Sequence, residues 1–197
     1  MKEGKKYELT AETTVNLFGK TLFRIKALVS FGNVEAGELG GFVEKEENLS
    51  QSGNAWVSGN AEVSGNAEVS GNARVYGDAW VSGNARVYGD ARVSGNAEVS
   101  GNARVSGNAR VSGNAEVSGD AEVSGNADYT TIKGFGSCFR CSTFFRCKDK
   151  EVRVVCGCFY GTIEEFRKKV KETHKETKLA EEYLMIADLM EKHFSND

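Results

Sequence analysis

The chain has 197 residues, of which 27% are charged, and its formal net charge is −3. This balance gives no general attraction to nucleic acid or to an anionic membrane, so a nucleic-acid polymer is not an expected partner. No apolar run approaches the ~20 residues of a membrane span and no signal segment is recognised, so we expect a cytoplasmic protein without membrane contact. Its five cysteines are then expected to be reduced thiols.

The first fifty residues are expected to cover one end of a repeat array, because an open β edge promotes aggregation. Residues 21–28 predict a strand that follows a turn at residues 18–20. Val43 and Leu49 fall in register with the later alanines, so the first, irregular coil is predicted to begin near Gly41. We therefore divide the chain into a β cap (1–41), a solenoid (42–129) and a C-terminal module (130–197).

Between Gln51 and Asp128 one six-residue unit, V-[S/Y]-G-[N/D]-A-x, recurs thirteen times. Such a strict period predicts a solenoid. Alanine and valine lie two positions apart and face the same side of an extended strand, while Gly-Asn supplies a corner. Three units would close an 18-residue triangular coil, with the next coil about 4.8 Å further along. Valines and alanines would fill the interior, and corner asparagines would form amide ladders.

The unit V-S-G-N-A-R resembles the consensus of the hexapeptide-repeat proteins. This resemblance implies a mainly β fold, a left-handed parallel β-helix, with a right-handed helix of the bactofilin type as the alternative. Acyltransferases of this fold use a histidine near a subunit boundary and a loop extruded from a coil, and the array has neither. Two histidines, His174 and His193, are too few for a γ-type carbonic anhydrase, and the outward threonines of ice-binding solenoids are missing. We expect no enzymatic activity and no catalytic residue.

The variable sixth residue of each unit falls on three faces of an 18-residue coil. The first face carries Trp56, Arg74, Arg92, Arg110 and Asp128, the second Glu62, Trp80, Glu98 and Glu116, and the third Glu68, Arg86, Arg104 and Glu122. Three successive arginines predict a site for a phosphate or carboxylate, with Trp56 or Tyr76 available to stack on a base. The predicted binding residues are Trp56, Arg74, Tyr76, Arg92 and Arg110. Two alternatives stay open: a basic face that meets the acidic face of another copy, and charge drift without function.

The tail predicts a ββαα module that supports homo-oligomerisation. Its strands are expected at residues 142–147 and 151–159, its first helix after Gly161 with Thr162 and Glu165 as a capping box, and its second helix from about Lys178. The aromatic residues exceed what a small core needs, which favours an oligomer interface. The predicted interface residues are Phe135, Phe139, Phe144, Phe145, Phe159, Tyr183 and Phe194.

The cysteines of the tail offer a minority alternative. Cys138, Cys141, Cys156 and Cys158 form a C-x2-C and a C-x-C pair that would suit a zinc ion, although buried cysteines are common in cores. The main expectation is no metal and no cofactor. Cys156 would need a nearby base to act as a nucleophile, and nothing in the sequence brings His174 close.

Two segments resemble phage and prophage proteins. YELTAETTV…TLFRIKAL…AGELGGFVEKEENLSQSGNAWV covers roughly residues 6–57, and TTIKGFGS…TFFRC…VRVVCGCFYGTIEEFRKKVKETH…EEYLMIADLMEKHF covers the tail. The resemblance implies a mobile-element origin and the cytoplasm of a bacterial host. We expect an accessory binding protein that neutralises a host protein or a small anionic ligand, such as a nucleotide signal in counter-defence. The alternatives are a polymer-forming scaffold of the bactofilin type and a zinc-stabilised adaptor.

Overall fold

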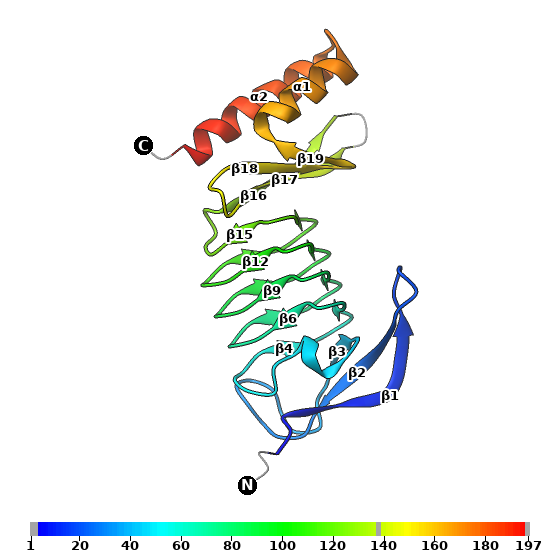
Figure 1. Ribbon diagram of the computed structural model, residues 1–197. Coiled ribbons are helices and arrows are strands. Elements are labelled where there is room, and N and C mark those ends of the chain that lie inside the picture. Colours follow the sequence, from blue (N-terminus) through cyan, green and yellow to red (C-terminus); the bar gives the residue numbers. More distant parts are fainter. Residues whose placement is uncertain (1–3, 137–138, 196–197) are drawn as a thin grey trace.

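The computed structural model describes residues 4–136 and 139–195. They form a mainly β rod, a β-solenoid of about five turns that carries a small two-helix part at its C-terminal end (Figure 1). The N-terminal strands and the C-terminal helices lie at opposite ends of the rod. No helix in the described part of the chain is long and apolar enough to cross a membrane.

Twelve two-residue strands build the solenoid. They are β4 (Trp56–Val57), β5 (Glu62–Val63), β6 (Glu68–Val69), β7 (Arg74–Val75), β8 (Trp80–Val81), β9 (Arg86–Val87), β10 (Arg92–Val93), β11 (Glu98–Val99), β12 (Arg104–Val105), β13 (Arg110–Val111), β14 (Glu116–Val117) and β15 (Glu122–Val123). Each pairs in parallel with a strand eighteen residues away in the sequence, as Arg74 does with Arg92, so the predicted coil length is confirmed.

The pairing produces three ladders with different outward charges. We call β4-β7-β10-β13 the arginine sheet, β5-β8-β11-β14 the acidic sheet and β6-β9-β12-β15 the mixed sheet. The valines from Val57 to Val123 and the alanines from Ala55 to Ala121 fill the interior, where each is at most 1% exposed. Glycine is required at the corners: Gly83, for example, has a φ of +68°, and a Cβ there would lie 2.9 Å from the backbone nitrogen of Gly101.

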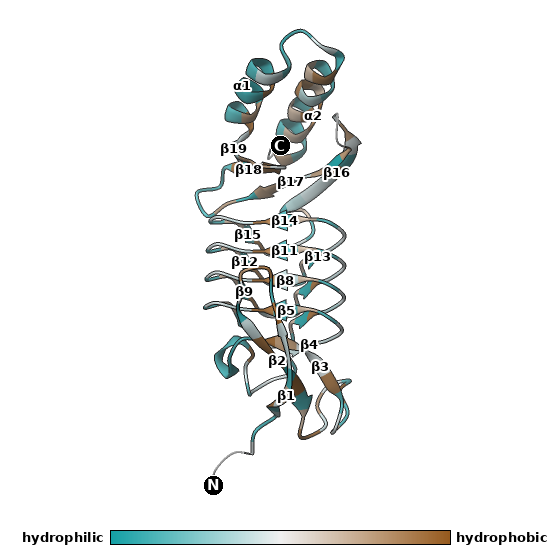
Figure 2. Ribbon diagram, turned by 90° about the vertical axis from the view of Figure 1, so that its right-hand side faces the viewer, coloured by the Kyte–Doolittle hydropathy of each residue, from teal (hydrophilic) through white to brown (hydrophobic). Residues whose placement is uncertain are grey.

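Three further strands and a short helix precede the array: β1 (Tyr7–Val15), β2 (Thr21–Ala27), β3 (Leu39–Val43) and the 3-10 helix η1 (Glu46–Asn48). β1 and β2 form an antiparallel hairpin, and β3 joins β2 to β5, which extends the acidic sheet to seven strands. The hairpin runs alongside the coils that carry β5 and β8 (Figure 2). The predicted strand at 21–28 is confirmed by β2, whereas β1 was not predicted.

The predicted register of the first coil is wrong. Val43 pairs with Val63 and Leu49 with Val69, twenty residues on rather than eighteen, so both align with valines and not with alanines. The two additional residues lie between Leu49 and Val57. Gln51, in this stretch, uses its side-chain oxygen to accept hydrogen bonds from the backbone nitrogens of Lys6 and Tyr7, at 2.8 and 3.3 Å. The first coil is therefore fitted to β1 and not to the repeat.

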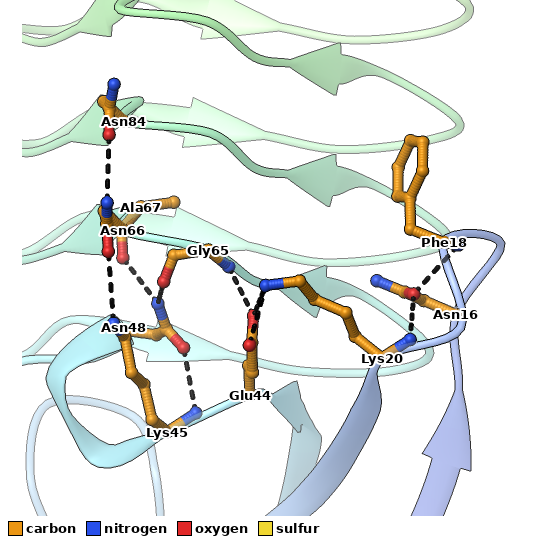
Figure 3. A network of polar contacts seen from close by, with 10 residues as sticks. All are labelled: Asn16, Phe18, Lys20, Glu44, Lys45, Asn48, Gly65, Asn66, Ala67 and Asn84. Carbon is orange, nitrogen blue, oxygen red and sulfur yellow. Dashed lines mark hydrogen bonds and ion pairs between the residues drawn. The ribbon is translucent and has the colours of Figure 1, made fainter.

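Different side chains satisfy the open carbonyls of the first coil on two faces. Lys6 donates from its ammonium to the carbonyls of Gly53 and Ala55, at 3.5 and 3.0 Å, next to the arginine sheet. Asn48 donates from its amide to the equivalent carbonyls of Gly65 and Ala67, at 3.2 and 2.8 Å, next to the mixed sheet (Figure 3). The same repeat positions thus meet a charged group on one face and a neutral group on another.

The predicted asparagine ladders are present at the corners. The most complete one runs from Lys45 through Asn66, Asn84 and Asn102 to Asp120, and each side chain donates to the oxygen of the next at 3.1–3.2 Å. Figure 3 shows its beginning. A cation donates at one end and a carboxylate accepts at the other, so the amides of this ladder share one direction.

The C-terminal part contains four strands and two helices: β16 (Tyr129–Phe135), β17 (Arg140–Arg146), β18 (Val152–Cys156), β19 (Phe159–Thr162), α1 (Ile163–His174) and α2 (Lys178–Phe194). The predicted second strand is two strands, because Gly157, at φ +61°, and Cys158 form a tight turn within it. The capping box of Thr162 and Glu165 and the start of α2 at Lys178 are confirmed. Because β16, which was not predicted, also precedes these strands, the expected ββαα order is ββββαα.

The two central strands of this antiparallel sheet, β17 and β18, are buried on both faces. Phe145, Cys147 and Val155 join the solenoid core, whereas Phe144 and Val154 pack with the helices. This double burial explains the abundance of aromatic residues that suggested an interface.

Most of the predicted interface aromatics belong to the interior of the chain. Phe144 and Phe145 are fully buried, Phe194 is buried, and Phe159 and Tyr183 are half-buried against the helices. The predicted role at an oligomer interface is therefore wrong for Phe144, Phe145 and Phe194, which have almost no exposed surface, and stays a prediction for Phe159 and Tyr183. Phe135 and Phe139, at 41% and 68% exposure, stay candidates for it.

Candidate anion-binding site

The arginine sheet places Arg74, Arg92 and Arg110 in one straight column. Their backbones pair directly, Arg74 with Arg92 and Arg92 with Arg110, which sets successive side chains about one strand spacing, roughly 4.8 Å, apart. Among the ion pairs of the described residues, none involves any of these three arginines. We call this column the arginine wall. It concentrates positive charge that the chain itself leaves unbalanced.

The mixed sheet shows what a balanced column looks like on the same backbone. There Arg86 lies 3.6 Å from Glu68, and Arg104 lies 3.4 Å from Glu122. Both arginines therefore have a carboxylate on the neighbouring coil. The arginine wall differs from this column in charge order and not in strand geometry.

A groove of about 470 Å³ runs along the wall at its N-terminal end. Its lining residues are Asn33, Trp56, Ser58, Arg74, Tyr76 and Arg92. Each of these side chains has an N–H or O–H that can donate a hydrogen bond, and none of them is acidic. The groove thus offers donors and positive charge to an oxygen-rich anion.

Arg110 lies beyond the groove and continues the wall toward the C-terminal part. Its backbone nitrogen donates to the side-chain oxygen of Asn126 at 2.9 Å, and its carbonyl accepts from the hydroxyl of Tyr129. These contacts fix the last strand of the sheet and leave the guanidinium exposed. Arg110 would reach only a ligand longer than the groove.

Trp56 does not offer an exposed ring, so the prediction that it stacks on a base is wrong. It is 4% exposed and packs edge-on against Tyr7 and Phe31, with ring centroids 6.4 and 5.4 Å away. The N-terminal segment covers the first coil and buries this indole. Tyr76, at 39% exposure, is the aromatic side chain that a ligand can reach.

Trp80 on the acidic sheet is also covered rather than free. The ring of Phe18, from the tip of the β1-β2 hairpin, lies 4.7 Å from it, and the indole is half-buried. Residues of the N-terminal segment thus pack on both tryptophans. The prediction that these indoles are exposed and mark contact surfaces is wrong.

Two groove residues were not predicted. Asn33 lies in the loop between β2 and β3, outside the repeat, and only the fold brings it to the wall. Ser58 occupies a position that is serine in most units, so the sequence does not distinguish it from the others. Neither residue carried a sequence feature that would have identified it.

The cysteines do not assemble as the zinc alternative requires. Ser142 pairs with Cys156 across β17 and β18, so Cys141, the next residue along β17, faces the other side of the sheet. Burial raises the pKa of the Cys141 thiol. Cys138 lies outside the described residues. Within these, no group of three or more His, Cys, Asp or Glu side chains is placed to hold a metal ion.

One prediction about the tail needs correction. Cys156 and His174 line the same cleft of about 280 Å³, together with Cys158 and Tyr183, although nothing in the sequence indicated their proximity. The ring of His174 stacks on that of Tyr183 at 5.7 Å. The cleft is formed because α1 packs on β18 and β19 and α2 packs against α1.

Comparison with known families supports the solenoid. The chain is similar to the YdcK beta solenoid repeat, whose model matches residues 67–83, 79–95, 85–101, 97–113 and 103–119. Together these overlapping matches span residues 67–119, about a quarter of the chain, and they lie wholly within the array. No curated protein matches the chain.

Proposed function

We propose that the chain is a non-enzymatic binding protein whose arginine wall captures an anionic ligand. The observation that carries this proposal is the contrast between Arg74, Arg92 and Arg110, which have no carboxylate partner among the described residues, and the paired arginines of the mixed sheet. Like charges on neighbouring strands are unfavourable by about 0.2–1 kcal/mol per pair. A bound anion would relieve that repulsion.

The chemistry of the groove favours phosphate or carboxylate groups. A guanidinium binds such groups through two parallel hydrogen bonds, and Ser58, Tyr76 and Asn33 add neutral donors. Tyr76 can also stack on a planar ring. A small molecule with two or more phosphates and one ring, such as a nucleoside diphosphate, matches these features.

The alternative of a copy-to-copy contact through the acidic sheet has less support. Glu62 and Glu116 are half-buried, and Trp80 lies against Phe18, so only Glu98 of this column is well exposed. A matching wall of arginines would find few reachable carboxylates. The polymer-forming scaffold also has less support, because β1 and β17 cover the two ends that end-to-end growth would use.

The finer features belong to the same proposal. We infer a left-handed coil of triangular section with a cap at each end, from the resemblance of the repeat to hexapeptide proteins. The resemblance of residues 6–57 to phage and prophage proteins supports a mobile-element origin. In that setting, the chain would neutralise an anionic host signal as an oligomer in the host cytoplasm.

Calorimetric titration with inorganic pyrophosphate and with a nucleoside diphosphate tests the proposal. Arg92→Gln removes the central charge of the wall and should weaken binding about 10–100-fold, which is the value of one charge-assisted hydrogen bond. Arg86→Gln removes an equivalent arginine from the mixed sheet and is the matched control. Equal affinity of both variants and the natural chain would remove the wall from the proposal.

A further inference from the structure

A second cleft lies between the tip of the β1-β2 hairpin and the acidic sheet. Its volume is about 370 Å³. Its lining residues are Val15, Asn16, Leu17, Asn60, Glu62, Asp78, Ala79, Trp80, Asn96 and Glu98. The hairpin supplies the apolar side chains, and three successive coils supply the carboxylates.

The lining of this cleft is acidic. Glu62, Asp78 and Glu98 contribute three carboxylates, and no lysine or arginine lies among the described residues that line it. The nearest lysine on the hairpin, Lys20, is held by Glu44 at 2.8 and 3.0 Å (Figure 3). Burial also raises the pKa of Glu62, as expected for a carboxylate that has lost water without gaining a cation.

Two buried donors at the cleft have no acceptor. Asn16 is 7% exposed, and its side-chain oxygen accepts from the backbone nitrogens of Phe18 and Lys20, both at 3.0 Å. Its amide nitrogen has no hydrogen-bond partner among the described residues, and neither has the indole nitrogen of Trp80. Figure 3 shows the Asn16 nitrogen directed away from the hairpin turn, toward the coils. Buried donors are rarely left unpaired.

The hairpin tip adds exposed apolar surface beside these donors. Leu17 is 92% exposed and Val15 is 65% exposed. A ligand that suits the cleft must therefore carry acceptor oxygens, positive charge and an apolar group. Small ammonium ions supply only the charge.

We propose that this cleft binds an extended, basic peptide segment of a partner protein. Backbone carbonyls of the peptide accept hydrogen bonds from Asn16 Nδ2 and Trp80 Nε1. A lysine or arginine side chain pairs with Glu98 on the acidic sheet, and a neighbouring apolar side chain packs on Leu17. The inference is independent of the arginine wall, which lies on another sheet.

Substitution of Asn16 separates hydrogen bonding from charge attraction. The probe is a blocked synthetic peptide of alternating lysine and valine, titrated by calorimetry against the full chain. Asn16→Asp keeps both accepted hydrogen bonds of the turn, adds negative charge and replaces the free donor with an acceptor. The proposal expects binding to weaken about tenfold or more, because a buried carbonyl loses its donor. Tighter binding would show simple charge attraction and would overturn the proposal.

Further arms test the charge and the class of ligand. Glu98→Gln should weaken binding of the lysine–valine peptide several-fold, about the effect of one partly exposed ion pair, whereas Glu68→Gln on the mixed sheet should not change it. A glutamate–valine peptide should not bind. Equal affinity for butane-1,4-diamine would identify a small-cation site and overturn the peptide assignment. Circular dichroism of each variant confirms that the solenoid is retained.

Discussion

The arginine sheet and the mixed sheet have the same repeat backbone and differ in the four outward side chains that they carry. The mixed sheet reads Glu, Arg, Arg, Glu from β6 to β15, and its ion pairs neutralise both arginines. The arginine sheet reads Trp, Arg, Arg, Arg from β4 to β13, and within the described residues its arginines have no acidic partner. The valine–alanine interior fixes the positions of the outward side chains. The charges of the neighbouring side chains in the same column determine whether an arginine is paired within the chain or available to a ligand.

The first coil repeats this contrast at its edge. The two carbonyls beside the arginine sheet meet the ammonium of Lys6, and the equivalent two beside the mixed sheet meet the amide of Asn48. The arginine sheet therefore begins next to a buried cation and continues as a column of cations. Lys6 and the three arginines thus align positive charges along this side of the rod, which would attract anions to the wall.

The largest expected effect tests the backbone that the sheets share. Gly83→Ala places a Cβ 2.9 Å from the backbone nitrogen of Gly101 at a φ of +68°. We expect a loss of about 3 kcal/mol or more in the free energy of unfolding, from strain and displacement of the coil.

Gly113 provides the matched control, because it has a similar φ of +71° but a Cβ there meets nothing within 4 Å. Gly113→Ala should cost only about 1–2 kcal/mol. Urea unfolding of both variants isolates the stacking contribution, and equal losses would contradict it.

Conversion of the mixed sheet into a second wall tests the role of charge order. Glu68→Arg with Glu122→Arg removes both ion pairs and stacks four arginines. We expect a loss of about 1–2 kcal/mol in stability and new, salt-dependent binding of pyrophosphate. The matched control, Glu68→Gln with Glu122→Gln, removes the same ion pairs without adding arginines and should bind far less. If the two double variants bind pyrophosphate equally, charge order is not what defines the site.

The repetitive features of this chain could be predicted because they depend on local rules. The coil length, the three outward columns and the asparagine ladders follow from a period of six and from the alternation of strands. The first turn of α1 could be predicted because Thr162 and Glu165 form a capping box within four residues. For the candidate site, the same rules placed Arg74, Arg92 and Arg110 in one column.

The remaining features depend on contacts between distant segments that do not repeat. Trp56 occupies the same repeat position as Arg74, yet it is buried because Tyr7 and Phe31 fold over the first coil. The aromatics of the tail looked excessive because the sequence does not show that Phe144 and Phe145 serve two different cores. Asn33 reaches the groove only through the loop that β2 and β3 position.

A change in pH should distinguish the two edges of the first coil. Burial lowers the pKa of Lys6 from 10.5 to about 8, so the unfolded chain holds this proton more tightly than the folded chain. The contribution of Lys6 to stability is therefore fully present above the unfolded pKa and is lost as pH falls through about 8. Between pH 7.5 and 10 we expect a gain on the order of 1 kcal/mol from this group. Urea unfolding should show this gain in the natural chain and not in Lys6→Met. If the free energy of unfolding of Lys6→Met rises with pH as much as that of the natural chain, the gain does not come from Lys6.

The smallest expected effect concerns the acidic sheet. It also places like charges on neighbouring strands, Glu98 and Glu116, but Glu116 is half-buried. Burial and the neighbouring Glu98 raise the pKa of Glu116, whereas Arg140 lowers it. The folded chain thus holds this proton more tightly than the unfolded chain. Stability from Glu116 is present below the ordinary pKa of a glutamate and is lost as pH rises through the raised value.

Glu116→Gln should therefore stabilise the chain at pH 7 by a few tenths of a kcal/mol, the usual scale of a like-charge pair on adjacent strands, and should not do so in acid. The backbone hydrogen bond from Glu116 to the Thr143 hydroxyl, at 2.9 Å, is kept in this variant. Thermal unfolding at the two pH values measures the difference. On the exposed arginine wall, Arg110→Gln removes an equivalent like-charge contact without a pH-dependent difference, because arginine stays charged throughout this range. A pH-independent effect of Glu116→Gln would show that packing, and not charge, separates the covered column from the open one.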